Sequence, residues 1–380
     1  MYARTFEQSI LTKGNFTEPK VQNMKALNLI FLSLILIAGL SSCQEELPFD
    51  GMQSRELKPE ENSNLLNPNS RNCGSEALMD RLLQDPAYAE AWRQKWSSRE
   101  LLSASRIDCN EPVLIPVAIH FQGLNNPDRS CLELLASEQI AALNADYRSL
   151  NADLSNWESG AADFFPEINI SGACLEFQIA SRNHPSGSGL SDGQAAITIN
   201  QVDGDFDRDW SGYLNVFVIK NTGYLGYAPL GGDGNGDGVV IDASAFGLGR
   251  TCSGVGAEEP FNLGRTLTHE MGHYFFLDHI WGDGCSVDDG IADTPEQANE
   301  NYGCPGLGIS SCGSPDLHMN YMDYTDDACM YMFTGGQVTR MENYLTTNLG
   351  TLVSNASEVL SAGDNTGGGN GEETNLNCSD

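Results

Sequence analysis

Three of the six histidines of this 380-residue chain lie within the short stretch from His269 to His279. His269 and His273 are four residues apart, so on a helix both imidazoles leave the same face, one turn apart. This HExxH spacing lets two nitrogens bind one zinc ion, with Glu270 beside the metal as a general base. His279 becomes a third ligand only if the chain turns after about Leu277. Three imidazoles with an open position are typical of a catalytic zinc site, and the alternative is a helix with incidental histidines.

The composition of the chain excludes some functions. A formal net charge of −32 would repel a polyanion, so we expect no nucleic-acid partner. Eleven cysteines indicate an oxidising compartment, and because the number is odd, at least one of them should lie outside an internal disulfide.

The first 43 residues have the pattern of an export signal. Lys25 precedes an apolar run at 26–38, which is short for a bilayer span, and residues 40–43 (LSSC) resemble a bacterial lipobox. We therefore expect translation to start at Met24, cleavage and lipidation at Cys43, and an outer-membrane or cell-surface location, with release to the extracellular space after activation. An ordinary signal peptide or a buried apolar helix is the alternative.

Residues 44–106 are predicted to be a tether and an inhibitory propeptide. The part at 44–70 is rich in Glu, Asn, Ser and Pro, and a helical stretch at 75–96 follows it. Arg99 and Arg106 end a polar segment before the next strand, which predicts proteolytic activation after one of them.

Cys73 is followed by Gly74, which would let the backbone approach a metal closely. A thiolate is a soft ligand that could occupy the open position of zinc, so Cys73 is a candidate inhibitory ligand in a latent form. The alternative is a disulfide, for example with Cys109.

Residues 107–361 are predicted to be the catalytic domain, of the α/β class. Four apolar or alternating runs are expected to be strands and one periodic segment a helix packed behind them. The strands are 113–121, 174–180, 213–219 and 238–241, and the helix is opened by Ser137, with Ile140, Leu143, Tyr147 and Leu150 on its apolar face. A disordered tail is expected at 362–380.

The HExxH segment with His279, followed by residues 320–324 (NYMDY), resembles the metzincin metalloproteases. Further motifs in the same order, such as 225–228 (LGYA) and 333–341 (FTGGQVTRM), narrow the resemblance to the pappalysin family, of the cytophagalysin or ulilysin type. The resemblance implies a twisted mixed sheet with a backing helix and an active-site helix above it. It also implies an irregular, disulfide-stabilised C-terminal subdomain that ends in a helix.

The resemblance also implies roles for single residues. Glu270 would act as general base and then acid, Met322 would form the Met-turn floor beneath the metal, and Tyr324 would stabilise the tetrahedral intermediate. Asp327 would lie at the base of an S1′ pocket that prefers Arg or Lys. The implied disulfides are Cys285–Cys312 and Cys304–Cys329, and the implied zinc ligands are His269, His273 and His279, with Cys73 in the latent form.

One position departs from the family pattern. Metzincins have glycine three residues after the second histidine, where the helix ends in a left-handed turn, and this chain has Phe276. Either Phe276 takes the strained conformation or the helix ends in a different turn.

The segment between His279 and Met322 has little periodic apolar pattern, so disulfides and calcium are expected to hold it. Asp288, Asp293 and Thr294 are the candidate calcium ligands, with Asp283 and Asp289 nearby. The alternative is that these are solvated loop acids.

These observations favour a secreted zinc metalloendopeptidase that acts on protein or peptide substrates and is made as a zymogen. One alternative is a non-catalytic surface lipoprotein that uses the same fold as a binding module. Another is a zinc hydrolase acting on a non-peptide bond.

Overall fold

The computed structural model describes residues 70–98 and 107–360. The expectations for Met24, Cys43, Arg99, Arg106 and the tail at 362–380 lie outside the described residues. Within the described ranges, no helix is both long and apolar enough to cross a membrane.

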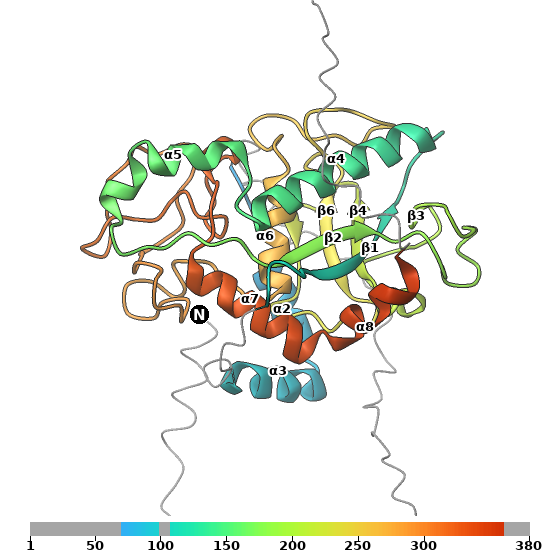
Figure 1. Cartoon of the computed structure of the whole chain (residues 1–380), viewed down its shortest axis with the longest axis horizontal. Coiled ribbons are helices and arrows are strands. Elements are labelled where there is room, and N and C mark those ends of the chain that lie inside the picture. Colours follow the sequence, from blue (N-terminus) through green and yellow to red (C-terminus); the bar gives the residue numbers. More distant parts are fainter. Residues whose placement is uncertain (1–69, 99–106, 361–380) are drawn as a thin grey trace, which may run out of the picture. The chain divides into compact units, whose positions relative to one another are not determined.

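One twisted, mainly parallel sheet forms the centre of the catalytic domain (Figure 1). Its order is β2-β1-β4-β6-β5, with β3 also pairing with β1. Only β5 runs antiparallel to its neighbour among these pairs, and it forms the edge of the sheet. The strands are β1 (Val113–Phe121), β2 (Leu175–Ile179), β3 (Ile197–Ile199), β4 (Leu214–Ile219), β5 (Gly226–Tyr227) and β6 (Gly238–Asp242). The α/β class and the mixed sheet are therefore confirmed.

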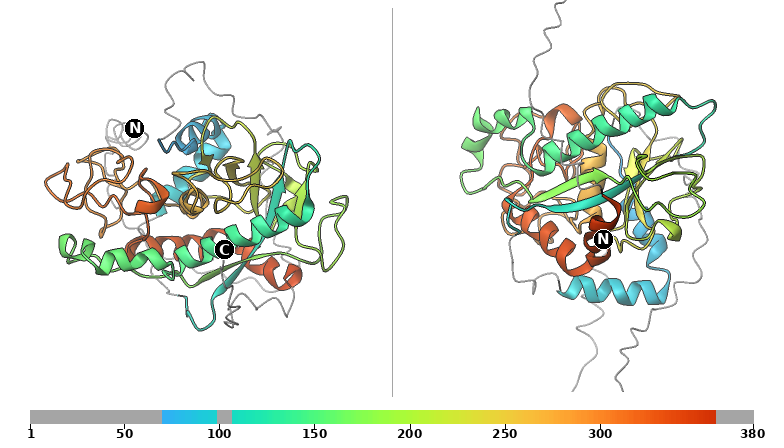
Figure 2. Two further views of the ribbon diagram at one scale, coloured as in Figure 1. Left: turned by 90° about the horizontal axis from the view of Figure 1, so that it is seen from above. Right: turned by 45° about the vertical axis from the view of Figure 1, so that its right-hand side comes forward.

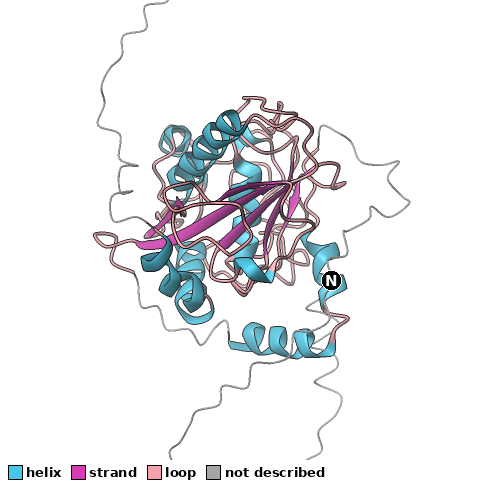
Figure 3. Ribbon diagram, turned by 90° about the vertical axis from the view of Figure 1, so that its right-hand side faces the viewer, coloured by secondary structure: helices cyan, strands magenta, loops and turns pink. Residues whose placement is uncertain are grey.

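The backing helix α4 (Arg129–Tyr147) and the active-site helix α6 (Arg265–Tyr274) pack against each other beside the sheet. The view in Figure 3 places the sheet between helices on its two sides. The expected start of α4 at Ser137 was wrong, because Asp128 accepts a hydrogen bond from the Cys131 amide and caps the helix earlier. Leu150 was also misplaced: it follows the helix and is 67% exposed.

Two pairs of longer helices come from the two ends of the described sequence, and Figure 2 shows them in further views. The segment at 70–98, which is expected to belong to the propeptide, forms α2 (Ser75–Leu82) and α3 (Pro86–Ser98), divided just before Pro86. At the other end lie α7 (Gly335–Asn348) and α8 (Gly350–Val359), and the capping box of Thr334 and Gln337 is present at α7. Short helical turns are η2 (Ala152–Leu154), α5 (Ser155–Glu158), η3 (Ala161–Phe164), η4 (Arg208–Trp210) and η5 (Asp327–Cys329).

Four disulfides lie within the described ranges. Two are the pairs that the family resemblance implied, Cys285–Cys312 and Cys304–Cys329. The other two, Cys109–Cys174 and Cys131–Cys252, tie the start of β1 and of α4 to more distant segments. Because Cys109 pairs with Cys174, the alternative disulfide for Cys73 is not formed.

Candidate metal centre and active site

Helix α6 brings His269 and His273 onto one face, and backbone carbonyls orient both rings. The Nδ1 atom of His269 lies 2.6 Å from the Tyr321 carbonyl oxygen, and that of His273 lies 2.8 Å from the Leu277 carbonyl oxygen. A carbonyl can only accept, so each Nδ1 carries the proton and each Nε2 keeps a free lone pair. Such a fixed tautomer is the one that a metal-ligating histidine needs.

The third histidine arrives through a left-handed turn at Phe276, whose φ is 74°. The Phe276 amide donates to the His273 carbonyl, and the Leu277 amide donates to the Gly272 carbonyl, both at 2.9 Å. This pair of bonds is the Schellman ending that usually has glycine at the left-handed position. Phe276 thus takes the strained conformation, which costs about 1–3 kcal/mol, and the chain then reaches His279.

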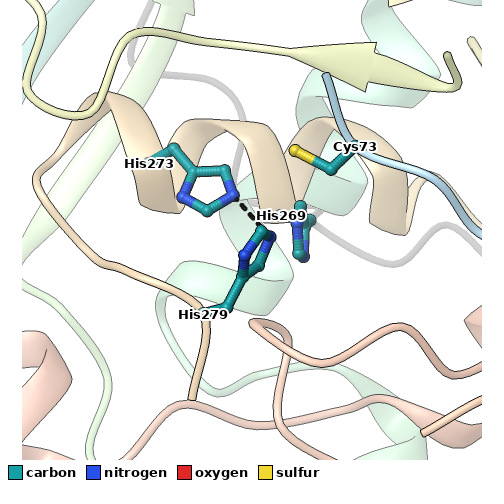
Figure 4. Close-up of side chains that lie close together, drawn as sticks. All are labelled: Cys73, His269, His273 and His279. Atoms are coloured by element: carbon teal, nitrogen blue, oxygen red, sulfur yellow. Dashed lines mark hydrogen bonds between the residues drawn. The ribbon is translucent and has the colours of Figure 1, made fainter. Parts of the chain in front are cut away.

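Four side chains converge at one point, as Figure 4 shows: His269, His273, His279 and Cys73, which lies just before α2. Their ligand atoms all lie within 4.8 Å of one another, and among the described residues this is the group that could hold a metal ion. The Nε2 atoms of His273 and His279 are 3.1 Å apart, while the buried Nε2 of His269 has no hydrogen-bond partner.

This donor set fits zinc. Burial lowers the pKa of His269 and His279 well below the usual range and that of His273 to about 4, so the imidazoles are neutral. A buried, unpartnered nitrogen is costly unless a further group satisfies it, and three imidazoles with one thiol are zinc ligands.

Glu270 lies beside this centre and is buried. Its Oε2 accepts hydrogen bonds from the Cys73 thiol and the Ser75 hydroxyl, both at 3.2 Å. Burial raises the pKa of Glu270 to about 8, more than these two hydrogen bonds lower it. Gly226 of β5 permits this approach, because a Cβ there would meet the Glu270 Cγ at 2.7 Å.

The backbone around Cys73 forms a parallel bridge to the sheet edge at β5. Cys73 pairs with Gly226, the Gly74 amide donates to the Gly226 carbonyl at 2.9 Å, and the Leu225 amide donates to the Asn72 carbonyl at 3.2 Å. The Ser75 hydroxyl also accepts from the Ala228 amide at 2.9 Å. The edge of the sheet at β5 is thus paired with the chain's own N-terminal segment around Cys73.

Met322 and Tyr324 both lie at the centre. Met322 is fully buried, and a Cβ at Gly272 of α6 would meet its sulfur at 2.4 Å, so Met322 packs directly against the helix between the first two histidines. The Tyr324 ring lies edge-on to His279, with ring centroids 4.9 Å apart, and 5.7 Å from His269.

Asp327 is fully buried and forms an ion pair with Arg71. The Arg71 guanidinium donates to its Oδ1 at 2.5 Å, and the amides of Leu263 and Arg265 donate to its Oδ2 at 2.8 and 3.2 Å. One oxygen of the Asp327 carboxylate thus accepts from backbone amides at the start of α6, while the other accepts from the Arg71 guanidinium.

The expected calcium ligands do not converge on one point. Both oxygens of Asp293 accept hydrogen bonds at the start of α7, from the Thr334 hydroxyl at 2.7 Å and the Gly336 amide at 2.8 Å. Thr294 donates to Asp289 at 2.7 Å, and Asp288 accepts from the Gly290 amide. The described residues form no group of these acids that could hold a cation, so calcium remains an untested prediction.

Sequence reasoning missed Arg71 and Ser75. Arg71 precedes Cys73 by two residues and is the same type as the side chains expected for the Asp327 pocket, so this spacing was a usable signal. For Ser75 there was none, because a serine at the start of a helix is ordinarily a capping residue.

Known proteins share both the sequence pattern and the fold. A model of the M43 peptidases, described as pregnancy-associated plasma protein-A, matches residues 254–346. Extracellular metalloprotease 1 of Coccidioides posadasii is 30% identical over 282 residues, covering 73% of this chain and 90% of that protein. An extracellular metalloprotease of Verticillium alfalfae is 44% identical over 138 residues, but the match covers 34% of this chain and only about half (49%) of that relative.

Two solved structures are similar over two thirds or more of this chain. A promirolysin mutant of Tannerella forsythia has 33% identity and a TM-score of 0.60, covering 77% of this chain and 100% of that chain. Mature mirolysin of the same organism, in complex with a cleaved peptide, has 34% identity and a TM-score of 0.52. The match covers 66% of this chain and 98% of that chain. With the histidine centre on α6, this likeness defines the class of protein as a metzincin zinc metalloprotease. Within that class, the chain belongs to the pappalysin family.

Proposed function

We propose that this chain is an exported zinc endopeptidase, made in a latent form, that cleaves peptide bonds next to arginine or lysine. The observation that carries the proposal is the position of the Cys73 sulfur, which faces the three histidine nitrogens from a strand of the propeptide. The same strand covers the sheet edge and places an arginine on Asp327, so one segment blocks the metal, the edge and the pocket together.

The chemistry follows from the residues around the centre. When bound to His269, His273 and His279, zinc would supply a Lewis acid that polarises the scissile carbonyl and lowers the pKa of water. Glu270 takes a proton from the attacking water and gives it to the leaving amine, because its carboxylate borders the centre. Tyr324 would donate its hydroxyl proton to the oxygen of the tetrahedral intermediate.

Latency has two parts in this proposal. Cys73 would occupy the open zinc position as a thiolate. The Ser75 hydroxyl would donate to the Glu270 carboxylate, which is the general base, and accept from the Ala228 amide. A substrate strand would need that amide as a backbone hydrogen-bond donor at the sheet edge. The similarity to a promirolysin supports a latent form for this chain.

Specificity would come from Asp327, which Arg71 occupies in the latent form. The propeptide runs parallel to β5, with Arg71 on the N-terminal side of Cys73. A substrate that pairs antiparallel to β5 runs in the opposite direction, so it would present the residue after the scissile bond to Asp327. We therefore expect arginine or lysine on the C-terminal side of the cut.

The export and domain assignments are part of the same proposal. Residues 1–43 would be the signal ending in lipidated Cys43, 44–106 the tether and propeptide, 107–361 the catalytic domain and 362–380 the tail. The names of the extracellular relatives support export. Cleavage after Arg99 or Arg106 would separate the catalytic domain from its lipid.

Degradation of a denatured protein by the purified chain tests the function. Activity that phenanthroline abolishes, with mapped cuts before Arg or Lys, is expected. The Glu270→Ala variant should retain zinc and lose activity, and comparable turnover would refute the role of Glu270. Zinc binding without cleavage of any protein would instead favour a binding module or a different hydrolase.

Latency is tested separately. Cys73→Ala should activate faster than the unmodified chain, whereas Gln84→Ala, an exposed change in the same propeptide, should not. Equal activation times for all three proteins would contradict a latent form held by Cys73.

A further inference from the structure

Phe276 is the unusual residue of this centre, and its side chain is as constrained as its backbone. Its ring is 2% exposed and stacks on Tyr344 of α7, with centroids 4.9 Å apart and planes 23° from parallel. The Trp96 ring of α3 packs edge-on against the Phe276 ring, with centroids 5.7 Å apart. A β-substituted residue does not prefer a φ of 74°, so the aromatic packing favours this conformation over the alternatives.

The turn at Phe276 sets the position of two of the three histidines. The next residue, Leu277, supplies the carbonyl that accepts from Nδ1 of His273 at 2.8 Å. His279 follows two residues later, and its Nε2 lies 3.1 Å from that of His273. If Phe276 left the left-handed conformation, the orienting carbonyl and the third imidazole would both move.

Tyr344 is itself fixed to the loop that ends α6. Its hydroxyl donates to the Gly232 carbonyl at 2.8 Å. The amides of Gly231 and Gly232 donate to the carbonyls of His273 and Tyr274, both at 2.9 Å. At Gly231 a Cβ would meet both the Tyr344 hydroxyl and the Phe276 ring within 2.8 Å, so the loop, the turn and Tyr344 fit closely.

We propose that Tyr344 is a positioning residue for the zinc site, acting through Phe276. Its ring holds the left-handed turn that glycine makes without support elsewhere in the class, and Trp96 adds a third aromatic face in the latent form. The inference rests on the zinc site proposed above and goes beyond it, because it assigns the position of the third ligand to a residue on the C-terminal helix.

Zinc affinity of the full chain, measured by competition with a chelator, tests this. Tyr344→Leu should weaken zinc binding about 10-fold or more, the size of effect seen for residues that orient metal ligands. Tyr344→Phe keeps the ring and should bind zinc nearly as well as the unmodified chain. With cobalt(II) in place of zinc, Tyr344→Leu should change the visible absorption spectrum and Tyr344→Phe should not.

Tyr213→Leu is the matched control. Tyr213 is also buried, lies edge-on to Trp210 and donates its hydroxyl to the Asn183 carbonyl at 3.0 Å, but it makes none of these contacts with the α6 turn. The Tyr213→Leu variant should lower the melting temperature and leave the zinc affinity unchanged. The loss in Tyr344→Leu should shrink in a Phe276→Gly background, because glycine needs no support.

Unchanged zinc affinity and cobalt spectrum in Tyr344→Leu would overturn the inference, as would an equal loss with Tyr213→Leu. If Phe276→Gly does not fold, the comparison of the leucine and phenylalanine variants at Tyr344 still decides. Failure of the unmodified chain to bind zinc would instead refute the proposed function.

Discussion

The guanidinium of Arg71 lies 2.5 Å from the carboxylate of Asp327, and the exposed fractions of the two side chains are 1% and 0%. These residues are 256 positions apart in the chain. Arg71 also donates to the Thr325 carbonyl and the Thr266 hydroxyl, at 3.1 and 3.2 Å. A buried ion pair is stable only when its remaining donors and acceptors have partners, and here they do. The pair connects the segment that we propose as the propeptide to the pocket that we propose for substrate arginine or lysine.

Arg71→Ala should therefore destabilise the latent form and shorten its activation time. Removing one partner of a buried ion pair typically costs about 3–5 kcal/mol, because the other charge stays buried. Arg71→Lys should recover only part of the loss, since an ammonium cannot replace the planar guanidinium. Thermal unfolding of the latent form and a time course of activation measure both effects.

Arg81→Ala is the control for that comparison. Arg81 pairs with Asp205 at 3.0 Å, but its side chain is 32% exposed, so its loss should cost at most about 1 kcal/mol. If the two alanine variants were equally stable and activated equally fast, the Arg71–Asp327 pair would not hold the propeptide.

Gly272→Ala should have opposite effects in two backgrounds. In the unmodified chain, the new methyl group would meet the buried Met322 sulfur at 2.4 Å. The crowding should cost about 1–3 kcal/mol, which exceeds the gain of about 1 kcal/mol from better helix propensity. In a Met322→Ala background the crowding is absent, so Gly272→Ala should stabilise. Urea unfolding of the four proteins checks this, and the same sign in both backgrounds would contradict the close contact.

Asp289 predicts a pH-dependent stability. Burial raises its pKa to about 8, and one of its oxygens is buried without a hydrogen-bond partner. Asp278 raises this pKa further and Arg340 lowers it. The folded state keeps the proton between the unfolded pKa of about 4 and the folded value, so Asp289 destabilises the fold increasingly as pH rises through this window.

Asp289→Asn should remove this effect. The free energy of unfolding of Asp289→Asn minus that of the unmodified chain should therefore increase from pH 5 to pH 8, measured by urea unfolding without divalent cations. A constant difference would show that Asp289 does not keep its proton in the folded state.

Asp293→Ala should destabilise the chain through α7 rather than through calcium. Its carboxylate accepts from Thr334 and Gly336 at the positive end of that helix. A hydrogen bond to a charged group contributes about 1.5–3 kcal/mol, and we expect Asp293→Ala to lower the free energy of unfolding by an amount in that range. Asp288→Ala, at an exposed position, should change stability by less than about 0.5 kcal/mol.

The same two variants test calcium. If Asp288 and Asp293 bind calcium together, EGTA should lower the melting temperature of the unmodified chain and leave both variants unaffected. If Asp293 acts only as a helix cap, EGTA should have no effect on any of the three proteins.

Local patterns in the sequence predicted much of the fold. The apolar run at 113–121 and the HExxH helix depend on neighbours within a few residues, so their structure is encoded locally. The start of α4 was missed because the expected apolar periodicity began at Ser137, whereas the cap at Asp128 begins the helix at Arg129, eight residues earlier.

The sequence by itself determined the chemical type of the centre: two histidines one helical turn apart, a glutamate between them and a thiol upstream. Only the tertiary structure decided how Phe276 could make a turn that glycine prefers, which side chain pairs with Asp327 and which hydroxyl binds Glu270. Phe276 stacks on Tyr344, and Asp327 pairs with Arg71. Glu270 accepts a hydrogen bond from Ser75. Each pair joins segments far apart in the chain, so no periodicity or spacing relates its members, and only the packing of the folded chain brings them together.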